Sequence, residues 1–316
     1  MNNIKSRKNK MMKYAVIIPA KNEERDLNGT LEGITNQSLL PVVVLVIDNN
    51  STDGTAEIIK EYAKKYPYVL YLFDNKGKGY ELGAPIVRLF NRGLKYLMQQ
   101  GYQFEFIVKM DADVKLETDT FEKVNEYIQG EQHPPGILSC IPSLSLNGRI
   151  KQMISPEWHT NGQLKIYNLQ CLKEIGSLKA DLGWDCADNI QAMQKKWKTY
   201  VIPYLTYELS RPVGRYSFEK GAVRQGLGAY KLRHSILYVL LKMSHDMFRK
   251  PYVLFSLYYF YGYISGTIKR KKRTLNKKEG KLLRKLLWAS FLKRLRKNQF
   301  LLLQRNKNNV SSTYST

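Results

Sequence analysis

The chain has 316 residues, which is enough for one large domain or two with an ample hydrophobic core. Its 51 Lys and Arg against 27 Asp and Glu give a net charge of +24, which predicts an acidic partner such as a nucleic acid, an anionic membrane surface or a phosphorylated substrate. Three scattered cysteines in no metal-ligand spacing argue against a disulfide framework and favour a reducing compartment.

The first residues form a basic tail, residues 1–13, followed by the short apolar run Ala15–Ala20. That run is too short for the core of a signal peptide, and no cleavage site follows it. We therefore interpret Ala15–Pro19 as a first strand and expect that the protein is not exported.

Strands and helices alternate along the first half of the chain. Strands are predicted at Tyr14–Ile18, Val42–Ile47, Val69–Phe73 and Phe104–Met110, and helices at Glu24–Thr35, Thr55–Tyr66 and Pro85–Gln99. This order predicts an α/β fold, in which a parallel sheet carries helices on both faces. Ligands of such sheets bind beyond the carboxyl ends of the strands.

The second half is less regular. It predicts, in order, a helix at Phe121–Ile128, a strand at Gly136–Ile141, a mixed segment at Gln163–Ile175, a helix at Asp185–Lys196 and a strand at Tyr200–Leu205. We expect these elements to complete the sheet and to build the second side of a cleft.

Polar loops follow each of the first four strands, with the sequences PAKNEE, DNNSTDGT, DNKGKG and DAD. Loops are polar in any protein, but acidic and amide side chains after every strand are unexpected in so basic a chain. In an extended segment the side chains of Asp111 and Asp113 point the same way, so both can bind one hard cation. A turn or a helix cap is the ordinary alternative for this pair.

The segments VIIPAKNEERDLNGTLEGITNQ, VVVLVIDNNSTDGTAEII and FIVKMDADV resemble the family 2 glycosyltransferases. The resemblance covers roughly Tyr14 to Gly214, and it implies a GT-A type, Rossmann-like, mixed and mostly parallel sheet. It also implies that Asp48 meets the nucleobase of a nucleotide-diphosphate sugar. The donor-binding residues that it implies are Pro19, Ala20, Asn22, Glu23, Asp48, Asn50, Lys109 and Asp111. From the residues alone, Asn50 is a turn residue.

The resemblance extends to GWDCADNIQAMQKKWKT, where Asp185 stands at the position of the catalytic base. Asp188 lies one helical turn further and could share that role. The residues alone equally fit an N-cap at Asp185. Trp184 and His159 are assigned to the acceptor side by the same resemblance, whereas a lone histidine is more often a surface or core residue.

The implied reaction is a metal-assisted, inverting transfer of a sugar to a hydroxyl of a glycan or lipid-linked acceptor. The implied cofactor is a divalent cation, Mn²⁺ or Mg²⁺, on Asp113 and Asp111. Relatives of this type often carry a histidine shortly before an Arg-Pro pair, where it can complete the metal site. This chain has Leu209 and Ser210 there, which leaves the third ligand open.

After Arg211 the chain becomes basic and aromatic. The segment Tyr252–Ile268 has 17 uncharged residues with five tyrosines, and KRKKR follows it. This pattern favours an interfacial or re-entrant helix on an anionic membrane surface over a full span; a helical hairpin packed on the domain is the alternative. We therefore predict a glycosyltransferase domain at residues 14–214, a helical membrane-associating region at 215–305 and a disordered tail at 306–316.

Two other functions compete with sugar transfer. The net charge of +24 fits a nucleic-acid-binding protein, but no zinc spacing or aromatic RNA-binding motif is present. A nucleotidyltransferase that makes the sugar nucleotide usually opens with a glycine-rich loop, and PAKNEE has no glycine. We therefore expect a cytoplasmic enzyme at the inner face of the membrane, with no specific nucleic acid as partner.

Overall fold

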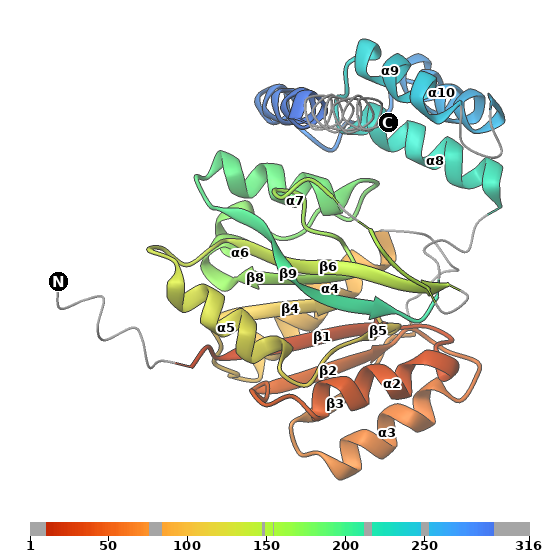
Figure 1. The fold of residues 1–316 in the computed structure, drawn as a ribbon. Helices are drawn as coiled ribbons and strands as arrows, with labels where there is room; N and C mark the ends of the chain where they lie inside the picture. The colour runs from red at the N-terminus through yellow and green to blue at the C-terminus, as the bar shows by residue number, and fades with distance from the viewer. Residues whose placement is uncertain are drawn as a thin grey trace, which may run out of the picture. The chain divides into compact units, whose positions relative to one another are not determined.

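The computed structural model describes residues 11–75, 84–146, 149–153, 155–211, 217–247 and 253–293. The chain divides into two compact units, Met1–Ser217 and Phe218–Thr316 (Figure 1). The predicted tail at 306–316, residues 1–10 of the predicted N-terminal tail and the greater part of the DNKGKG loop lie outside the described residues.

The first unit is built on a nine-stranded sheet. The strand order is β3 (Val69–Phe73), β2 (Val43–Asp48), β1 (Tyr14–Ala20), β4 (Phe106–Met110), β8 (Leu164–Asn168), β6 (Ile137–Leu146), β9 (Thr199–Leu209) and β5 (Val114–Lys115), with β7 (Arg149–Gln152) paired to β6. Strands β3, β2, β1 and β4 are parallel neighbours, as the alternating pattern predicts. β8 pairs antiparallel with β4, so the sheet is mixed.

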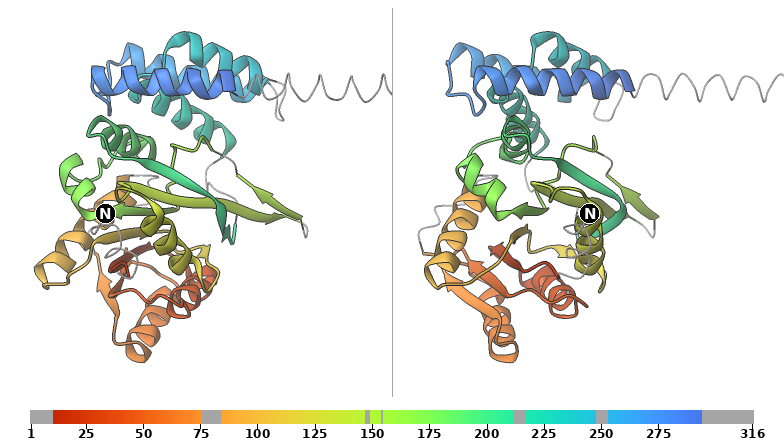
Figure 2. Two further views of the ribbon diagram at one scale, coloured as in Figure 1. Left: turned by 60° about the vertical axis from the view of Figure 1, so that its left-hand side comes forward. Right: turned by 90° about the vertical axis from the view of Figure 1, so that its left-hand side faces the viewer.

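Both faces of the central strands are buried, which explains their continuous apolar sequences. Every residue of β1 and β2 is buried. Val16 and Ile18 pack in one core with α2 (Glu24–Thr35), α3 (Thr55–Lys65) and α5 (Thr120–Gly130). Ala15 and Ile17 point the other way, into a core with α4 (Ala84–Gln99), α6 (Leu169–Ile175) and α7 (Trp184–Gln194). The predicted helices on both faces of the sheet are thereby confirmed (Figure 2).

The strands of the second half are longer than their sequences indicate. β9 runs to Leu209, past the predicted end at Leu205, and its pairing with β6 shifts register between Cys140 and Ile141. Residues 203–205 of β9 have no partner on β6, and Pro203 in this segment has no N–H to donate to a neighbouring strand. This irregularity carries β9 on to the edge where Val114 of β5 pairs with Leu209.

The C-terminal unit is helical. It contains α8 (Phe218–Lys231), α9 (Ile236–Asp246), α10 (Val253–Ile268) and a further helix at residues 277–293. Helices α8 and α10 touch through their backbones, because a Cβ on Gly226 would lie 1.8 Å from the carbonyl oxygen of Tyr259. None of the helices among the described residues combines the length and the hydropathy that crossing a membrane requires.

Candidate active site

The carboxyl ends of β1, β2 and β4 share one edge of the sheet. Ala20 at the end of β1 lies beside Asp48 at the end of β2. β4 lies parallel to β1 on its other side and leads directly into Asp111. The predicted donor residues Pro19, Ala20, Asp48, Lys109 and Asp111 therefore stand at or beside the same edge, as the parallel order requires.

The loops after β1 and β2 hold each other through hydrogen bonds. The side chain of Asn22 accepts from the amide of Thr52 at 2.8 Å, and the amide of Glu23 donates to Oγ1 of Thr55 at 2.8 Å. Asn22 and Asn50 have φ values of 53° and 55°, in the left-handed region that asparagine tolerates better than most residues. The asparagines thus shape two interlocked loops.

Asp48 is buried at the base of these loops, with an exposed fraction of 1%. Its Oδ1 accepts from the amide of Ser51 at 2.9 Å, and its Oδ2 accepts from the hydroxyl of Tyr71 at 3.5 Å. Burial and the neighbouring Asp48 carboxylate raise the pKa of Tyr71. Asp48 therefore stabilises the loop locally, and a role toward a nucleobase stays a prediction.

Lys109 links the loop after β4 to the segment before β8. The lysine is buried on β4, and its Nζ pairs with Asp111 and donates to the carbonyl oxygen of Gly162 at 2.6 Å. Two partners satisfy the buried charge, as a cation taken out of water requires. The carboxylate of Asp111 is thereby connected to the loop that carries His159.

Arg211 joins three carboxylates, of which Asp113 follows β4 and the other two lie at the start of α2. Its Nε lies 3.0 Å from Oδ2 of Asp113, its Nη1 lies 3.2 Å from Oδ2 of Asp26, and its Nη2 pairs with Glu23. Burial and the nearby Asp111 raise the pKa of Asp113, while Arg211 opposes that rise. The sequence analysis gave this arginine no role, although the Arg-Pro pair that it begins is a signal that marks it.

Trp184 and Asp185 begin α7. The indole of Trp184 lies between two buried cations, with the Nζ of Lys109 at 5.5 Å and the Nζ of Lys165 at 5.4 Å from its ring centroid. Asp185 is partly exposed in the first turn of the helix. Among the described residues, no group donates a hydrogen bond to its carboxylate, and the residue that caps the helix is Gly183.

Asp188 has a different environment. It is 2% exposed, and both of its oxygens accept from Nζ of Lys165, at 2.7 and 2.6 Å. The hydroxyl of Tyr167 donates to Oδ2 at 2.6 Å. Burial raises the pKa of Asp188, and Lys165 opposes that effect. Asp188 is thus a buried structural partner of Lys165, and a share in acid–base chemistry stays a prediction that its burial does not favour.

The segment from His159 to Gly162 lies against Asp185. A Cβ on Gly162 would meet Cβ of Asp185 at 3.3 Å and Cζ2 of Trp184 at 3.2 Å, so only glycine fits without displacing them. Burial, assisted by Lys165, lowers the pKa of His159, and Asp185 opposes this. The structure therefore brings together His159, Trp184 and Asp185, which were predicted for the acceptor side and the catalytic base.

Unsatisfied polar atoms gather at this edge. Within the described residues, four buried side-chain atoms on these loops have no hydrogen-bond partner: Asn49 Oδ1, His159 Nδ1, Asn161 Nδ2 and Ser210 Oγ. Buried polar atoms are nearly always paired in folded proteins. A cluster of unpaired ones fits a place where a polar ligand binds.

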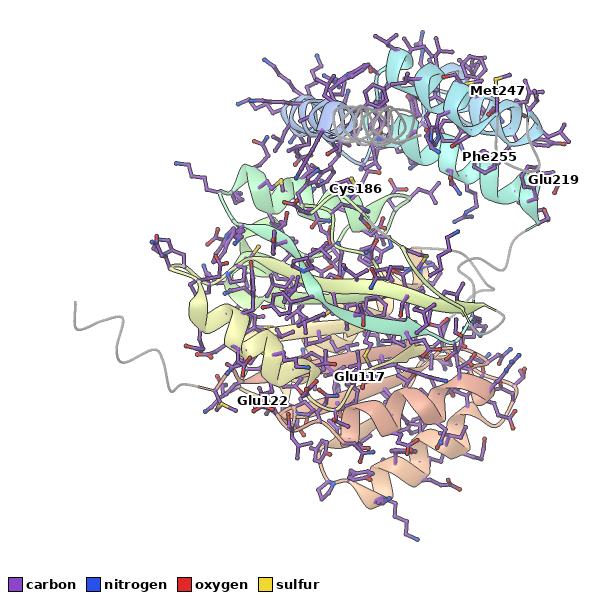
Figure 3. All side chains as sticks on the ribbon, viewed as in Figure 1. Glu117, Glu122, Cys186, Glu219, Met247 and Phe255 are labelled. Atoms are coloured by element: carbon purple, nitrogen blue, oxygen red, sulfur yellow. The ribbon has the colours of Figure 1, made fainter. Side chains whose placement is uncertain are left out.

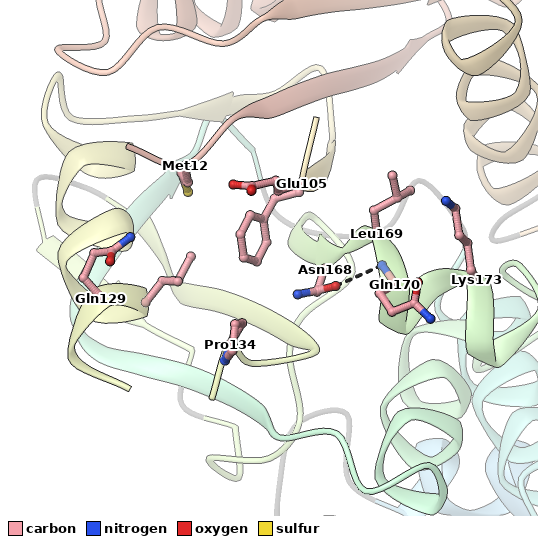
Figure 4. A pocket seen from close by; sticks show the side chains of 10 residues that line it. Met12, Glu105, Gln129, Pro134, Asn168, Leu169, Gln170 and Lys173 are labelled. Carbon is pink, nitrogen blue, oxygen red and sulfur yellow. Dashed lines mark hydrogen bonds between the residues drawn. The ribbon is translucent and has the colours of Figure 1, made fainter. Parts of the chain in front are cut away.

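A pocket of about 410 Å³ lies elsewhere, at the opposite edge of the sheet (Figure 4). Its lining includes Met12, just before β1, and Glu105 and Phe106 at the start of β4. Asn168 at the end of β8 and Lys173 on α6 also line it. None of the predicted site residues lines it. The pocket is therefore separate from the loops at the carboxyl ends of the strands.

Comparison with known proteins gives a family and a fold. Residues 15–137 match the family model "Glycosyl transferase family 2". The chain is 31% identical over 131 residues to 4,4'-diaponeurosporenoate glycosyltransferase of Staphylococcus haemolyticus, an overlap of 40% of this chain and 31% of that protein. The chain spans about a third to a half of the length of the first curated relatives it matches.

Two solved structures show the same fold. Mannosyltransferase PcManGT from Pyrobaculum calidifontis, in complex with GDP-Man and Mn²⁺, has a TM-score of 0.54 and 15% identity, and the match covers 99% of this chain and 93% of that one. S. aureus TarS 1–349 in complex with UDP-GlcNAc has a TM-score of 0.53 and 18% identity, over 75% of this chain and 73% of that one. Residues 15–137 thus match glycosyl transferase family 2, and the fold of the chain is the GT-A fold.

Proposed function

We propose that the chain is an inverting glycosyltransferase that moves a sugar from a nucleotide-diphosphate sugar to a hydroxyl of a glycan or lipid-linked acceptor. One observation carries the proposal: Asp185, whose carboxylate accepts no hydrogen bond from the described residues, lies with its Cβ against Gly162, and the carbonyl oxygen of Gly162 accepts from the lysine that pairs with Asp111. Three contacts thus connect Asp185 to the DAD motif. This arrangement suits a base near a diphosphate.

Asp185 has the features that a general base needs. Its carboxylate has no donor among the described residues, and it stands in the first turn of a helix that is fixed from behind by Lys165, which donates to the carbonyl oxygen of Asp185 at 2.6 Å. In the proposed reaction Asp185 removes the proton of the acceptor hydroxyl as its oxygen attacks the anomeric carbon. A single displacement of this kind inverts the anomeric configuration.

His159 is proposed to orient the acceptor. Burial lowers its pKa, so the ring is neutral near pH 7, and its buried Nδ1 has no partner within the described part of the chain. A neutral imidazole nitrogen can accept or donate one hydrogen bond to a sugar hydroxyl. Trp184, which lies against Gly162, is proposed to offer an apolar ring edge to the same substrate.

The DAD motif fits a divalent cation through its ligand chemistry. Asp111 and Asp113 supply carboxylate oxygens, which Mn²⁺ and Mg²⁺ accept, and their mutual repulsion contributes to the raised pKa of Asp113. No cluster of three metal-binding side chains is found among the described residues, so the diphosphate and water would supply the remaining ligands. When bound, the ion would neutralise charge on the departing diphosphate.

The interlocked loops after β1 and β2 are proposed to bind the nucleoside. Asn49 Oδ1 is buried without a partner beside Asp48, within the described residues, and it can accept from a base or a ribose hydroxyl. A thermal-shift panel of UDP, GDP, dTDP and CMP, with and without Mn²⁺, tests the donor site: one nucleoside diphosphate should raise the melting temperature with Mn²⁺, and no shift with any of them would refute the assignment.

We further propose that the enzyme works at the cytoplasmic face of a membrane, where a lipid-linked or membrane-bound acceptor is available. The strongly basic, apolar C-terminal unit supports this location.

A further inference from the structure

The positive charge of the chain is concentrated in its C-terminal unit. Residues 218–316 contain 23 Lys and Arg against three Asp and Glu, a net charge of +20. Residues 1–217 contain 28 Lys and Arg against 24 Asp and Glu, a net charge of only +4. An anionic partner that is attracted by the charge of this protein therefore meets the C-terminal unit.

One side of α10 is occupied by packing inside the unit. Tyr259, Gly262, Tyr263 and Gly266 are buried on that side. A Cβ on Gly262 would lie 2.0 Å from the carbonyl oxygen of Val223 on α8, so the two helices are in direct backbone contact. The hydroxyl of Tyr263 donates to the carbonyl oxygen of His234 at 2.9 Å, which fixes the rotation of α10 about its axis.

The other side of α10 is apolar and exposed, and α9, which is in contact with α10, also carries exposed apolar residues. The exposed residues recur at helical spacing; they are Ile236, Leu237, Leu240 and Met247 on and just after α9, and Val253, Leu254, Leu257, Tyr258, Tyr261 and Ile268 on α10. Figure 3 draws the side chains of both helices and labels Met247. Exposed fractions reach 61% at Leu237 and 75% at Ile268. A helix that is apolar all round is normally buried all round, so this face requires a cover.

Basic side chains directly border the apolar face. Ile268 is the last residue of α10, and the exposed residues Lys269, Arg270, Lys271 and Lys272 follow it. Arg273 stacks on Tyr230 at 4.0 Å and donates to the carbonyl oxygen of the same residue at 2.9 Å, which anchors the basic turn to α8. The cations are therefore held next to the apolar face.

We propose that the exposed face of α9 and α10 docks on an anionic lipid bilayer, with its leucines among the acyl chains and Lys269–Lys272 at the phosphates. A nucleic acid would meet the cations and leave the leucines in water, whereas the interface of a bilayer suits both, and tyrosines favour that depth. This inference refines the membrane attachment proposed above and is independent of the sugar transferred.

Flotation of the full chain with vesicles tests the inference. The chain should float with vesicles of phosphatidylcholine and phosphatidylglycerol, float less with phosphatidylcholine alone, and detach as salt is raised. The variant Leu254→Ser/Leu257→Ser should lower the apparent partition coefficient about tenfold or more, because two half-exposed leucines lose their contact with lipid. A matched control is Ile150→Ser on β7, where an isoleucine is 76% exposed in the other unit.

A label gives a second readout. The three native cysteines, Cys140, Cys171 and Cys186, are all buried, so a fluorophore can be placed on Leu257→Cys alone. Its emission should shift to the blue on anionic vesicles, and the same label on Ile150→Cys should not shift. Equal flotation of the wild type and the double variant would overturn the inference. The inference would also be overturned if the wild type formed a dimer and did not bind vesicles, and if the double variant were monomeric. The exposed face would then be covered by a second copy of the chain. Nucleotide binding by the Leu254→Ser/Leu257→Ser and Ile150→Ser variants should stay unchanged. A failure of the membrane inference can therefore be distinguished from a failure of the sugar-transfer proposal.

Discussion

Arg211 and Asp113 form an ion pair in which Nε lies 3.0 Å from Oδ2, so an arginine at the end of β9 neutralises the second carboxylate of the DAD motif. The same guanidinium contacts Glu23, the N-cap of α2, and Asp26 in the first turn of α2. Arg211 thus connects the start of α2 to the DAD motif. It also occupies the carboxylate that a divalent cation would use, so the two cations compete for Asp113.

Removing this arginine should strengthen metal binding. In Arg211→Gln the carboxylates of Glu23, Asp26 and Asp113 lose their shared cation, and the apparent Kd for Mn²⁺ should fall about tenfold because the local field becomes more negative. Titration calorimetry with Mn²⁺ measures this without turnover. Arg25→Gln, which removes the same charge from an exposed position on α2, should leave the Kd unchanged. Weaker binding in Arg211→Gln would show that the arginine supports the site through its geometry.

The buried pair of Lys165 and Asp188 should matter for stability. Replacing Asp188 by Asn leaves the lysine charge buried without a counter-ion, and the free energy of unfolding should fall by about 3–5 kcal/mol. Chemical denaturation measures the loss. Asp119→Asn breaks an exposed pair with Lys123 and should cost less than about 1 kcal/mol. A fully stable Asp188→Asn protein would contradict this structural role of the pair.

The contact between α8 and α10 should tolerate no side chain at its centre. Gly262→Ala would push a methyl group into the carbonyl of Val223, and we expect it to destabilise the C-terminal unit by about 1–3 kcal/mol or more. Gly228→Ala on α8 is the control, because no atom lies within 4 Å of a Cβ there. It should be neutral or stabilising by up to about 1 kcal/mol. Hydrogen exchange of α8 and α10 compares the two variants.

His234 should make the C-terminal unit sensitive to acid. Burial, with Lys242 nearby, lowers its pKa to about 4, and its buried Nδ1 has no partner in the described residues. In the unfolded chain His234 is therefore protonated as the pH falls below about 6.5, whereas in the folded unit it is protonated only below about pH 4. The contribution of neutral His234 to the free energy of unfolding is complete above pH 6.5. It is lost as the pH falls from 6.5 to about 4, and the loss is on the order of 3 kcal/mol.

The variant His234→Phe tests this window, since it keeps the ring that packs edge-on against Tyr238. Hydrogen exchange of α8 and α9 should show a smaller loss of protection between pH 6.5 and pH 4 than in the wild type. An unchanged pH dependence would place the acid sensitivity elsewhere.

The parallel half of the fold was predictable because its strands are buried on both faces and read as continuous apolar runs. Residues 215–305 were predicted as a helical region without bounds for each helix, and the packing of α8 depends on Gly226, which lets α10 approach. The short strands β5 and β7 have too few residues for a pattern. Tertiary packing determines where these elements begin and end, and a local sequence pattern does not show this packing.

The candidate site was predictable where residues share a strand end and not where distant segments meet. Asp111, Asp113 and Asp185 were identified from motifs. Asp113 pairs with Arg211 because β5 and β9 become neighbours only in the folded sheet, and Asp188 on α7 pairs with Lys165 on the distant strand β8. Asp185 and Asp188 look alike in the sequence of one helix. They differ in the structure because only Asp188 pairs with Lys165.

The most direct test of the account compares Asp185→Asn with the wild type in two assays. Turnover of the nucleotide sugar should fall about 10²–10⁴-fold, because the acceptor hydroxyl loses its base. The affinity for the nucleoside diphosphate that stabilises the wild type should stay unchanged, since Asp185 makes no contact that holds the loops after β1 and β2. Asp119→Asn should behave as wild type in both. An Asp185→Asn enzyme that retains full turnover would contradict the account.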